Sequence, residues 1–257
     1  MKKRDIHRLF RQAVQILFFL WMPALYTSAF SAVRYVIEQI RAGAPIERNG
    51  FLTTFLVLCG ITILFGRICC GYACAFGTLG DGMHALFLWI RKKLKKKKKL
   101  PWVSAALSRR LQKIKYILCI LLMLIYGTGN THYFQGSSPW EVFSMLYAGK
   151  IPDASYLVGW ILFLLILIGM CVKERFFCQY LCPMGAIFAW LPVLPCSVLD
   201  RDRGQCLPRC KACEMTCPVD LQIQKDQKDG GECIQCRQCV YICPKQNIHS
   251  FIKKNKK

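Results

Sequence analysis

Four long apolar stretches dominate the pattern of hydrophobic and polar positions along the chain. They cover residues 13–33, 50–66, 115–131 and 154–172. A helix needs about 20 mostly apolar residues to cross about 30 Å of hydrocarbon, so the pattern predicts four transmembrane helices. Residues 50–66 are short for a span, although the uncharged chain resumes directly after Arg67.

The second and fourth stretches are followed by related sequences, GRICCGYACAFG and ERFFCQYLCPMG, which lie 108 residues apart. Each contains a Cys-x3-Cys pair, and the two pairs are Cys70 with Cys74 and Cys178 with Cys182. This order predicts a duplicated two-helix unit in parallel orientation, because two spans return the chain to the same side. The uncharged segments that follow, residues 83–90 and 187–199, are expected to form interfacial or re-entrant helices.

The charged residues lie mostly outside the apolar stretches and define their orientation. Although 54% of the residues are hydrophobic, Lys and Arg number 36 against 14 Asp and Glu, a net charge of +22. A mean hydropathy of +0.29 excludes a disordered chain. With four spans, 32 basic residues fall on one side and 4 on the other. Because Lys and Arg accumulate in cytoplasmic loops, the count predicts a multi-pass protein of the cytoplasmic membrane with both termini in the cytoplasm.

Two basic segments have alternative interpretations. The N-terminal residues could begin a secretory signal, but the apolar run at 13–33 is longer than the 7 to 15 residues of a signal's apolar region. The run RKKLKKKKK at 91–99 could bind nucleic acid, but no aromatic stacking platform accompanies it. Anionic lipid headgroups attract such loops. We therefore expect membrane lipid, and not nucleic acid, as the partner of these segments.

Residues 206–243 hold eight cysteines in two groups. The second group is a complete C-x2-C-x2-C-x3-C-P run, in which three cysteines bind one [4Fe–4S] cluster and the fourth binds another. Together the groups resemble the two-[4Fe–4S] bacterial ferredoxin domain. We expect a membrane domain at 1–199 and a small α+β ferredoxin-like cytoplasmic domain at 200–257. The shared-ligand rule assigns one cluster to Cys206, Cys210, Cys213 and Cys243, and the other to Cys233, Cys236, Cys239 and Cys217.

The first group departs from the ferredoxin pattern. Three residues, not two, separate Cys206 from Cys210, so Cys206 needs a one-residue bulge to reach its iron. Cys196 is the substitute ligand. Zinc sites use pairs of cysteines rather than a run that ends in Cys-Pro, and disulfides need an oxidising compartment, so both alternatives are less consistent with this segment.

The two Cys-x3-Cys pairs allow several kinds of chemistry. Cysteine is often a small buried packing residue, and that interpretation suits the single cysteines at 59, 119 and 171. Paired cysteines at equivalent positions of two repeats would instead converge on one pseudo-twofold axis. Four thiolates there could bind one iron or zinc ion, belong to a further Fe–S centre, or cycle as redox thiols.

Across essentially its whole length the chain resembles the polyferredoxin membrane proteins of the NapH and NosR type, and it is similar to the membrane core of the MauN and CcoG proteins. The resemblance implies a cytoplasmic ferredoxin domain and electron movement between the cytoplasmic or quinone side and a redox partner across the membrane. Ala75 stands where the family motif has proline, which predicts a looser turn at the first pair. The outer loops are too short for the large extracytoplasmic flavin-binding domain of NosR-type proteins.

Several other chemistries lack their motifs in this chain. No Cys-x-x-Cys-His, P-loop or dinucleotide-binding glycine motif is present, so c-type haem attachment, nucleotide-driven pumping and NAD(P)H oxidation are unsupported. We expect an iron–sulfur electron-transfer protein with no catalytic side chains, acting as a quinol dehydrogenase-like component of an oxidoreductase system. Its partners would be quinone, an extracytoplasmic flavin- or haem-containing protein, or a cytoplasmic reductant. The alternative is a maturation or assembly protein that supplies electrons or metal to a client enzyme.

Overall fold

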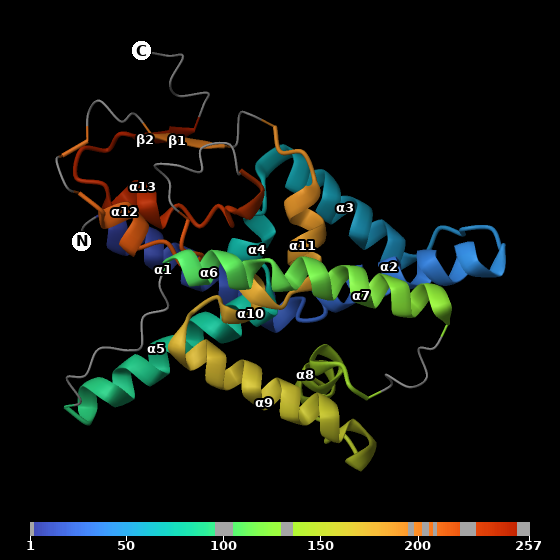
Figure 1. Cartoon of the computed structure of the whole chain (residues 1–257). Helices are drawn as coiled ribbons and strands as arrows, with labels where there is room; N and C mark the ends of the chain where they lie inside the picture. Colours follow the sequence, from blue (N-terminus) through green and yellow to red (C-terminus); the bar gives the residue numbers. More distant parts are fainter. Residues whose placement is uncertain are drawn as a thin grey trace.

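Helices form nearly all of the regular structure (Figure 1). The computed structural model describes residues 3–95, 105–129, 136–194, 198–201, 206–207, 210–221 and 230–250. The longer helices are α1 (Lys3–Trp21), α2 (Leu25–Ala42), α3 (Gly50–Phe65), α5 (Ala75–Lys93), α7 (Ile114–Thr128) and α9 (Leu157–Val172). The shorter ones are α4 (Ile68–Tyr72), α6 (Ala105–Gln112), α8 (Pro139–Tyr147), α10 (Phe176–Tyr180), α11 (Pro183–Trp190), α12 (Ala212–Met215) and α13 (Gln238–Ile242), with 3-10 turns η2 (Ala154–Tyr156) and η4 (Gly230–Glu232).

Three helical segments are long and apolar enough to cross a membrane, and they are Ile68–Lys93, Leu107–Thr128 and Ala154–Val172. The last coincides with a predicted span, and the second contains most of the predicted span at 115–131. A fourth crossing results if the bent pair Arg4–Trp21 and Leu25–Ala42 forms one span. The described residues therefore contain three to four candidate spans, in a mostly helical fold.

The predicted span at 13–33 is broken in the structure. Helix α1 ends at Trp21, α2 begins at Leu25, and their axes bend by 57°. Pro23 lies at the break, and proline cannot continue a helix because it has no amide hydrogen and its ring clashes with the preceding turn. Counting apolar residues alone missed this interruption.

The predicted span at 50–66 is a shorter helix. α3 has 16 residues. At its start the Asn49 side chain accepts a hydrogen bond of 2.8 Å from the Leu52 amide, and Gly66, whose φ is +69°, follows its last residue. Glycine is suited to that left-handed conformation because it has no Cβ. Length and composition make α3 an apolar helix but not by themselves a membrane span.

Residues 83–90 belong to α5, which is longer than the short interfacial or re-entrant helix expected there. α5 starts at Ala75, and the helical segment Ile68–Lys93 is a candidate span. Asp81 interrupts the apolar run in the sequence, but in the structure its carboxylate pairs with Arg11 and Arg175. Neutralising the charge lets the helix continue through a buried environment. Of residues 187–199, α11 includes only the first part, and 195–197 lie outside the described residues.

The C-terminal part combines short helices with a two-stranded antiparallel sheet. β1 (Leu199–Arg201) pairs with β2 (Ile248–Ser250), and Arg201 lies opposite Ile248. In Figure 1 these strands lie with α12 and α13 on one side of the molecule, on the other side from α8 and α9. Helix α13 also packs against α1. Chain ends that are far apart in the sequence therefore build one region.

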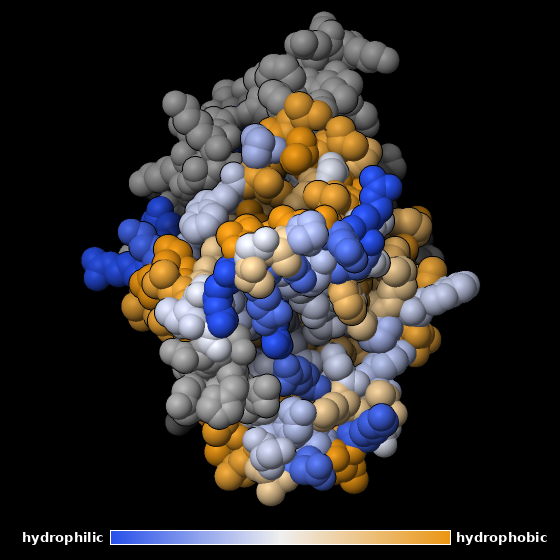
Figure 2. All heavy atoms as spheres, turned by 90° about the vertical axis from the view of Figure 1, so that its right-hand side faces the viewer, coloured by the Kyte–Doolittle hydropathy of each residue, from blue (hydrophilic) through white to orange (hydrophobic). Residues whose placement is uncertain are grey.

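Large apolar side chains are exposed along the outer helices. On α3, α7 and α9 they include Leu56, Val57, Ile117, Leu121, Leu124, Leu164, Leu165 and Ile168. Figure 2, which views the end where α2, α3 and α7 project, shows hydrophobic residues around the periphery and hydrophilic residues gathered between them. Apolar surface this extensive is unfavourable in water, so these faces are suited to contact with lipid.

Candidate redox sites

The two Cys-x3-Cys pairs lie in matching local structures. The first cysteine of each pair, Cys70 or Cys178, is part of a five-residue helix, α4 or α10. The second, Cys74 or Cys182, is the N-cap of the next helix, α5 or α11. Backbone angles are φ −76° and ψ 117° at Cys74, and φ −72° and ψ 112° at Cys182. Both halves of the predicted repeat thus fold in the same way at the cysteines.

The four thiols of these pairs lie in one buried core. Each of the four cysteines is only 4–5% exposed, and all belong to the same cluster of packed residues. The thiols of Cys74 and Cys178 share a hydrogen bond, and the Tyr26 hydroxyl donates a hydrogen bond of 3.3 Å to the Cys70 sulfur. The structure therefore brings together the residues that the repeat predicted to converge. We call this group the four-cysteine site.

Two buried arginines flank the four-cysteine site. Arg67 and Arg175 stand three residues before Cys70 and Cys178, and they are 2% and 1% exposed. Each guanidinium hydrogen-bonds the thiol of the cysteine that follows it. Among the described residues, the Nε atom of each arginine is buried without a hydrogen-bond partner. Two buried positive charges with unused N–H groups favour an anionic occupant whose sulfides accept hydrogen bonds, because an unpaired buried N–H is unfavourable.

Partly buried carboxylates hold the arginines in place. Nη2 of Arg175 donates to Asp81 at 2.7 Å, and its Nη1 donates to the Cys70 carbonyl at 2.8 Å. Nη1 of Arg67 donates to Glu232 at 3.1 Å. Both arginines stand in the repeated segments of the sequence, but the sequence analysis missed their contacts with thiols and carboxylates. Their identical offset from the cysteines was the signal that could have identified them.

Electrostatics prepare one thiol of the site for metal binding. Cys178 lies beyond the candidate span that ends at Val172. The hydrogen bond from Cys74, together with the charges of Arg175 and Arg67, lowers the pKa of Cys178 to about 6, although burial opposes the shift. A thiol with so low a pKa is largely a thiolate at neutral pH, and the thiolate is the form that binds metal.

The spacing of the thiols differs from that of a single-metal site. In the part of the chain that the structure describes, no three His, Cys, Asp or Glu side chains are arranged to hold one metal ion. Zinc–sulfur bonds of about 2.3 Å would draw four sulfurs close together. A cubane cluster holds its cysteines farther apart, because each sulfur binds a different iron.

The second ferredoxin-like group packs directly against the four-cysteine site. A Cβ atom on Gly71 of α4 would lie 2.4 Å from the Ile234 carbonyl oxygen and 3.6 Å from the Cys236 amide nitrogen. Only glycine permits this approach, since any side chain would displace the neighbouring backbone. Cys217 and Cys236 pack in the same hydrophobic core as the four thiols. The two sets of cysteines thus share one interior.

Cysteines 217, 233, 236 and 239 lie close enough together to influence one another electrostatically. Burial raises the pKa of Cys217 to about 12 and that of Cys233 to about 11. Thiols with such pKa values stay protonated at neutral pH unless a bound cation replaces the proton. The donor set consequently fits a metal centre, which would supply the positive charge that this interior lacks.

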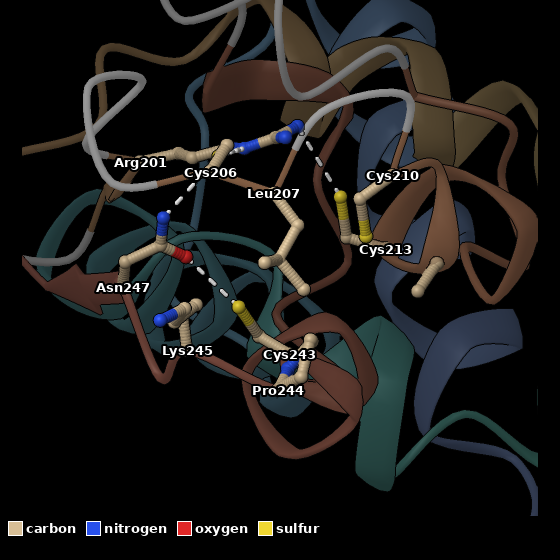
Figure 3. Close-up of a pocket in the computed structure, with 10 residues that line it drawn as sticks. Arg201, Cys206, Leu207, Cys210, Cys213, Cys243, Pro244, Lys245 and Asn247 are labelled. Carbon is tan, nitrogen blue, oxygen red and sulfur yellow. Dashed lines mark hydrogen bonds between the residues drawn. The ribbon is translucent and has the colours of Figure 1, made fainter.

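The other four of the eight cysteines at 206–243 line one pocket, shown in Figure 3. They are Cys206, Cys210, Cys213 and Cys243, the set that the shared-ligand rule assigned to a single cluster. Cys206 reaches this pocket in spite of its longer spacing, and Leu207 lies between it and the other cysteines in the view. Cys196, the substitute ligand, falls outside the described residues. We call this group the outer pocket.

A family model described as a 4Fe-4S binding domain matches the chain at residues 50–97 and 156–194. Each matched segment contains one Cys-x3-Cys pair, and neither reaches the cysteines at 206–243. Two uncharacterized proteins of Methanocaldococcus jannaschii are each 28% identical to the chain, over 97% and 96% of this chain and 90% and 96% of their own lengths. NirI of Paracoccus denitrificans is 30% identical over 77% of this chain but only 28% of its own length.

Ferredoxin-type proteins complete the comparison. NapH of Haemophilus influenzae is 23% identical over 70% of this chain and 61% of its own length. The regulatory protein NosR of Stutzerimonas stutzeri is 25% identical over 76% of this chain and 26% of its own length. The chain is thus similar to the NapH- and NosR-type membrane polyferredoxins. No solved structure matches it significantly.

In this chain, proline follows Cys182 but alanine follows Cys74. Ala75 and Pro183 both occupy the first position of a helix, where proline is tolerated but not required. The backbone angles before them are nearly equal, so the expected looser turn at the first pair is not observed. The departure from the family motif leaves the local fold of the site unchanged.

Proposed function

We propose that this chain transfers electrons within the membrane through iron–sulfur clusters. The observation that carries the proposal is the contact of Gly71 with the segment at Ile234 and Cys236, which joins the four-cysteine site to a ferredoxin-like cysteine set without intervening structure. Proteins named for ferredoxin-type and electron-transport roles are among the relatives of the chain. The clusters would supply the redox chemistry, and the protein would supply their spacing, their environment and hydrogen bonds to sulfur.

The proposed cofactors are two [4Fe–4S] clusters in the ferredoxin-like domain at 200–257 and a further Fe–S centre at the four-cysteine site. Cys206, Cys210, Cys213 and Cys243 would hold the first cluster, and Cys217, Cys233, Cys236 and Cys239 the second. Buried Arg67 and Arg175 with their unused Nε atoms support an anionic cluster at Cys70, Cys74, Cys178 and Cys182. The family model matching these pairs supports the same choice over zinc or redox thiols.

The excess of basic residues on one side supports the proposed topology. We place the chain in the cytoplasmic membrane, with the termini and the ferredoxin-like domain at 200–257 in the cytoplasm. This topology needs four crossings, and the bent pair of α1 and α2 would form the first of them. The membrane domain at 1–199 would then carry electrons toward the outer side.

The electron-exchange partner is proposed to be quinone or an extracytoplasmic redox protein. A cavity of about 570 Å³ between α6, α7, the end of α11 and η4 supports quinone. It lies within the size range of small-molecule sites, and its lining includes Tyr116, Pro192, Val193 and Glu232. Glu232 also pairs with Arg67, so the cavity wall is linked to the four-cysteine site.

The proposal is tested by anaerobic purification of the intact protein and of a variant with all four membrane cysteines changed to serine (Cys70→Ser, Cys74→Ser, Cys178→Ser and Cys182→Ser). Iron, sulfide and EPR signals are quantified in both. We expect about twelve irons in the intact protein and about eight in the variant, since each cubane holds four irons. Equal iron content and identical spectra would exclude the third centre, and absence of Fe–S clusters from both proteins would exclude the function.

A second measurement separates electron transfer from the assembly role. An electron-transfer component should be reoxidised by a quinone analogue in repeated turnovers, whereas an assembly factor is needed only while its client matures. Reduced protein in lipid nanodiscs would be mixed with a soluble quinone and followed by loss of its cluster EPR signal. Reoxidation through many cycles would favour the proposed function.

A further inference from the structure

Arg201 is a buried arginine that lies directly beside the sulfurs of the outer pocket. It ends strand β1 and is 5% exposed. The antiparallel register sets it opposite Ile248, next to Asn247. The two-stranded sheet therefore carries two polar side chains, Arg201 and Asn247, to the same wall of the pocket (Figure 3).

Both side chains donate hydrogen bonds to cysteine sulfurs. Nε of Arg201 lies 2.9 Å from the Cys206 sulfur, and its Nη1 lies 3.4 Å from the Cys213 sulfur. Nδ2 of Asn247 lies 3.2 Å from the Cys206 sulfur. One guanidinium thus joins two of the four cysteines, and Cys206 receives two donors. These two hydrogen bonds also hold Cys206 in the pocket despite its longer spacing from Cys210.

The second ferredoxin-like set is surrounded differently. The Cys217 sulfur accepts a backbone hydrogen bond of 3.4 Å from Leu221. Among the described residues, no cationic side chain is hydrogen-bonded to the sulfurs of this set. Arg11 and Arg175 act on Cys236 through space, and both are engaged by the Asp81 carboxylate, which offsets their charge. The direct cation–sulfur contact distinguishes the outer pocket.

We propose that Arg201 makes the cluster of the outer pocket the more easily reduced of the two ferredoxin-like clusters. The inference rests on the proposed function. Reduction adds one electron to a cluster without forming or breaking a bond, and the added negative charge spreads over its sulfurs. Hydrogen bonds and positive charge at those sulfurs stabilise the reduced form and raise its potential. Arg201 is thus a positioning and tuning residue, and it does not react.

The asymmetry gives the two clusters different roles. The set that contains Cys236 packs against the four-cysteine site, whereas the outer pocket lies in the sheet region beside β1 and β2. A higher potential at the outer pocket would retain an electron there, at the end of the chain of centres that is farther from the membrane pairs. Removing Arg201 would reduce this bias.

The test uses the full-length protein, purified anaerobically in detergent with its clusters, and EPR-monitored redox titration. Arg201→Gln removes the charge, and Arg201→Lys keeps the charge but cannot donate from two nitrogens to two sulfurs. Lys245→Gln is the matched control, because Lys245 lines the same pocket and is exposed but is not bonded to sulfur. Iron is counted in every sample before titration.

We expect Arg201→Gln to shift one cluster midpoint to a more negative value and leave the other unchanged, with a smaller negative shift in Arg201→Lys and none in Lys245→Gln. Unchanged midpoints in both Arg201 variants with full iron content would overturn the inference while leaving the proposed function intact. If Arg201→Gln fails to assemble the outer cluster, the midpoint potential of Arg201→Lys becomes the test. An unshifted midpoint in that variant also overturns the inference. Absence of clusters from the unaltered protein would instead remove the proposed function itself.

Discussion

The four-cysteine site and the outer pocket use the same residue type in two different settings. The cysteines of the four-cysteine site are all at most 5% exposed, lie in or at the start of helices of two repeats, and are flanked by arginines with partly buried carboxylate partners. In the outer pocket only Cys213, on the short helix α12, is buried, and the other three cysteines are partly exposed and lie outside helices and strands. The helical site is held by packing, and the outer pocket by a few polar contacts.

This difference suggests how a substitution should act in each region. A change in the four-cysteine site disturbs close packing and buried charge, so it should affect folding and the contact with the segment that carries Cys236. A change in the outer pocket alters hydrogen bonds to sulfur, so it should affect potential more than stability. The four-cysteine site contacts the segment that carries Cys236 through Gly71, so a change at this residue disturbs the closely packed setting most directly.

Gly71→Leu should have the largest effect. The new Cβ would lie 2.4 Å from the Ile234 carbonyl oxygen, so α4 and the segment that carries Cys236 must separate. Overpacking of this kind costs about 1–3 kcal/mol. We expect a lower thermal unfolding temperature in detergent and loss of rapid electron exchange between the Cys236 cluster and the four-cysteine site, measured by freeze-quench EPR.

Gly82→Leu is the matched control for that change. Gly82 also lies in a helical segment, but a Cβ there would meet no atom within 4 Å. Its substitution should leave both the unfolding temperature and the electron exchange nearly unchanged. Equal behaviour of the two variants would contradict the close contact at Gly71.

Part of this architecture could be predicted from the sequence because it depends on regular spacing. The recurrence of Cys-x3-Cys after 108 residues indicated that four thiols would meet, and the structure brings Cys70, Cys74, Cys178 and Cys182 into one core. The apolar run at 154–172 likewise coincides with a candidate span. Periodicity and repetition are properties of the sequence itself, so they need no knowledge of tertiary contacts.

Other features depended on partners that are distant in the sequence. Asp81 interrupts an apolar run, yet the helix continues because Arg11 and Arg175, 70 and 94 residues away, neutralise the carboxylate. Arg201 and Asn247 meet at Cys206 only after β1 and β2 pair. Neither set of contacts is marked by a pattern in the local sequence. Pro23, in contrast, was visible in the sequence and should have divided the first span.

Glu232, which pairs with Arg67 beside the four-cysteine site, provides a smaller, pH-dependent test of how that site is held. Burial alone would raise its pKa, but Arg67, Lys115 and Tyr116 outweigh burial and lower the pKa below the ordinary 4.5. A carboxylate with a lowered folded-state pKa stabilises the protein above its unfolded-state pKa, and this contribution disappears as pH falls through the folded-state value. Glu232→Gln should therefore be less stable than the unaltered protein between pH 7 and 5.

The difference in unfolding temperature between the two proteins should stay constant from pH 7 to about pH 5 and narrow below about pH 4.5. Thermal unfolding across this range, monitored by circular dichroism, measures it. Glu38→Gln is the control, because Glu38 pairs with Arg34 on a partly exposed face and exposed pairs contribute little. A difference for Glu232→Gln that does not change with pH would show that the carboxylate acts by shape alone.

Ala75→Pro should have the smallest effect and sharpens the comparison between the two halves of the four-cysteine site. Ala75 is the first residue of α5, and the preceding Cys74 has the extended backbone that proline requires of the residue before it. Pro183 already occupies the equivalent position in α11. Proline at a compatible position stabilises by about 0.4–1 kcal/mol, because it restricts the unfolded chain. We expect a slightly higher unfolding temperature with unchanged iron content, and loss of iron would show that the two pairs hold their cluster unequally.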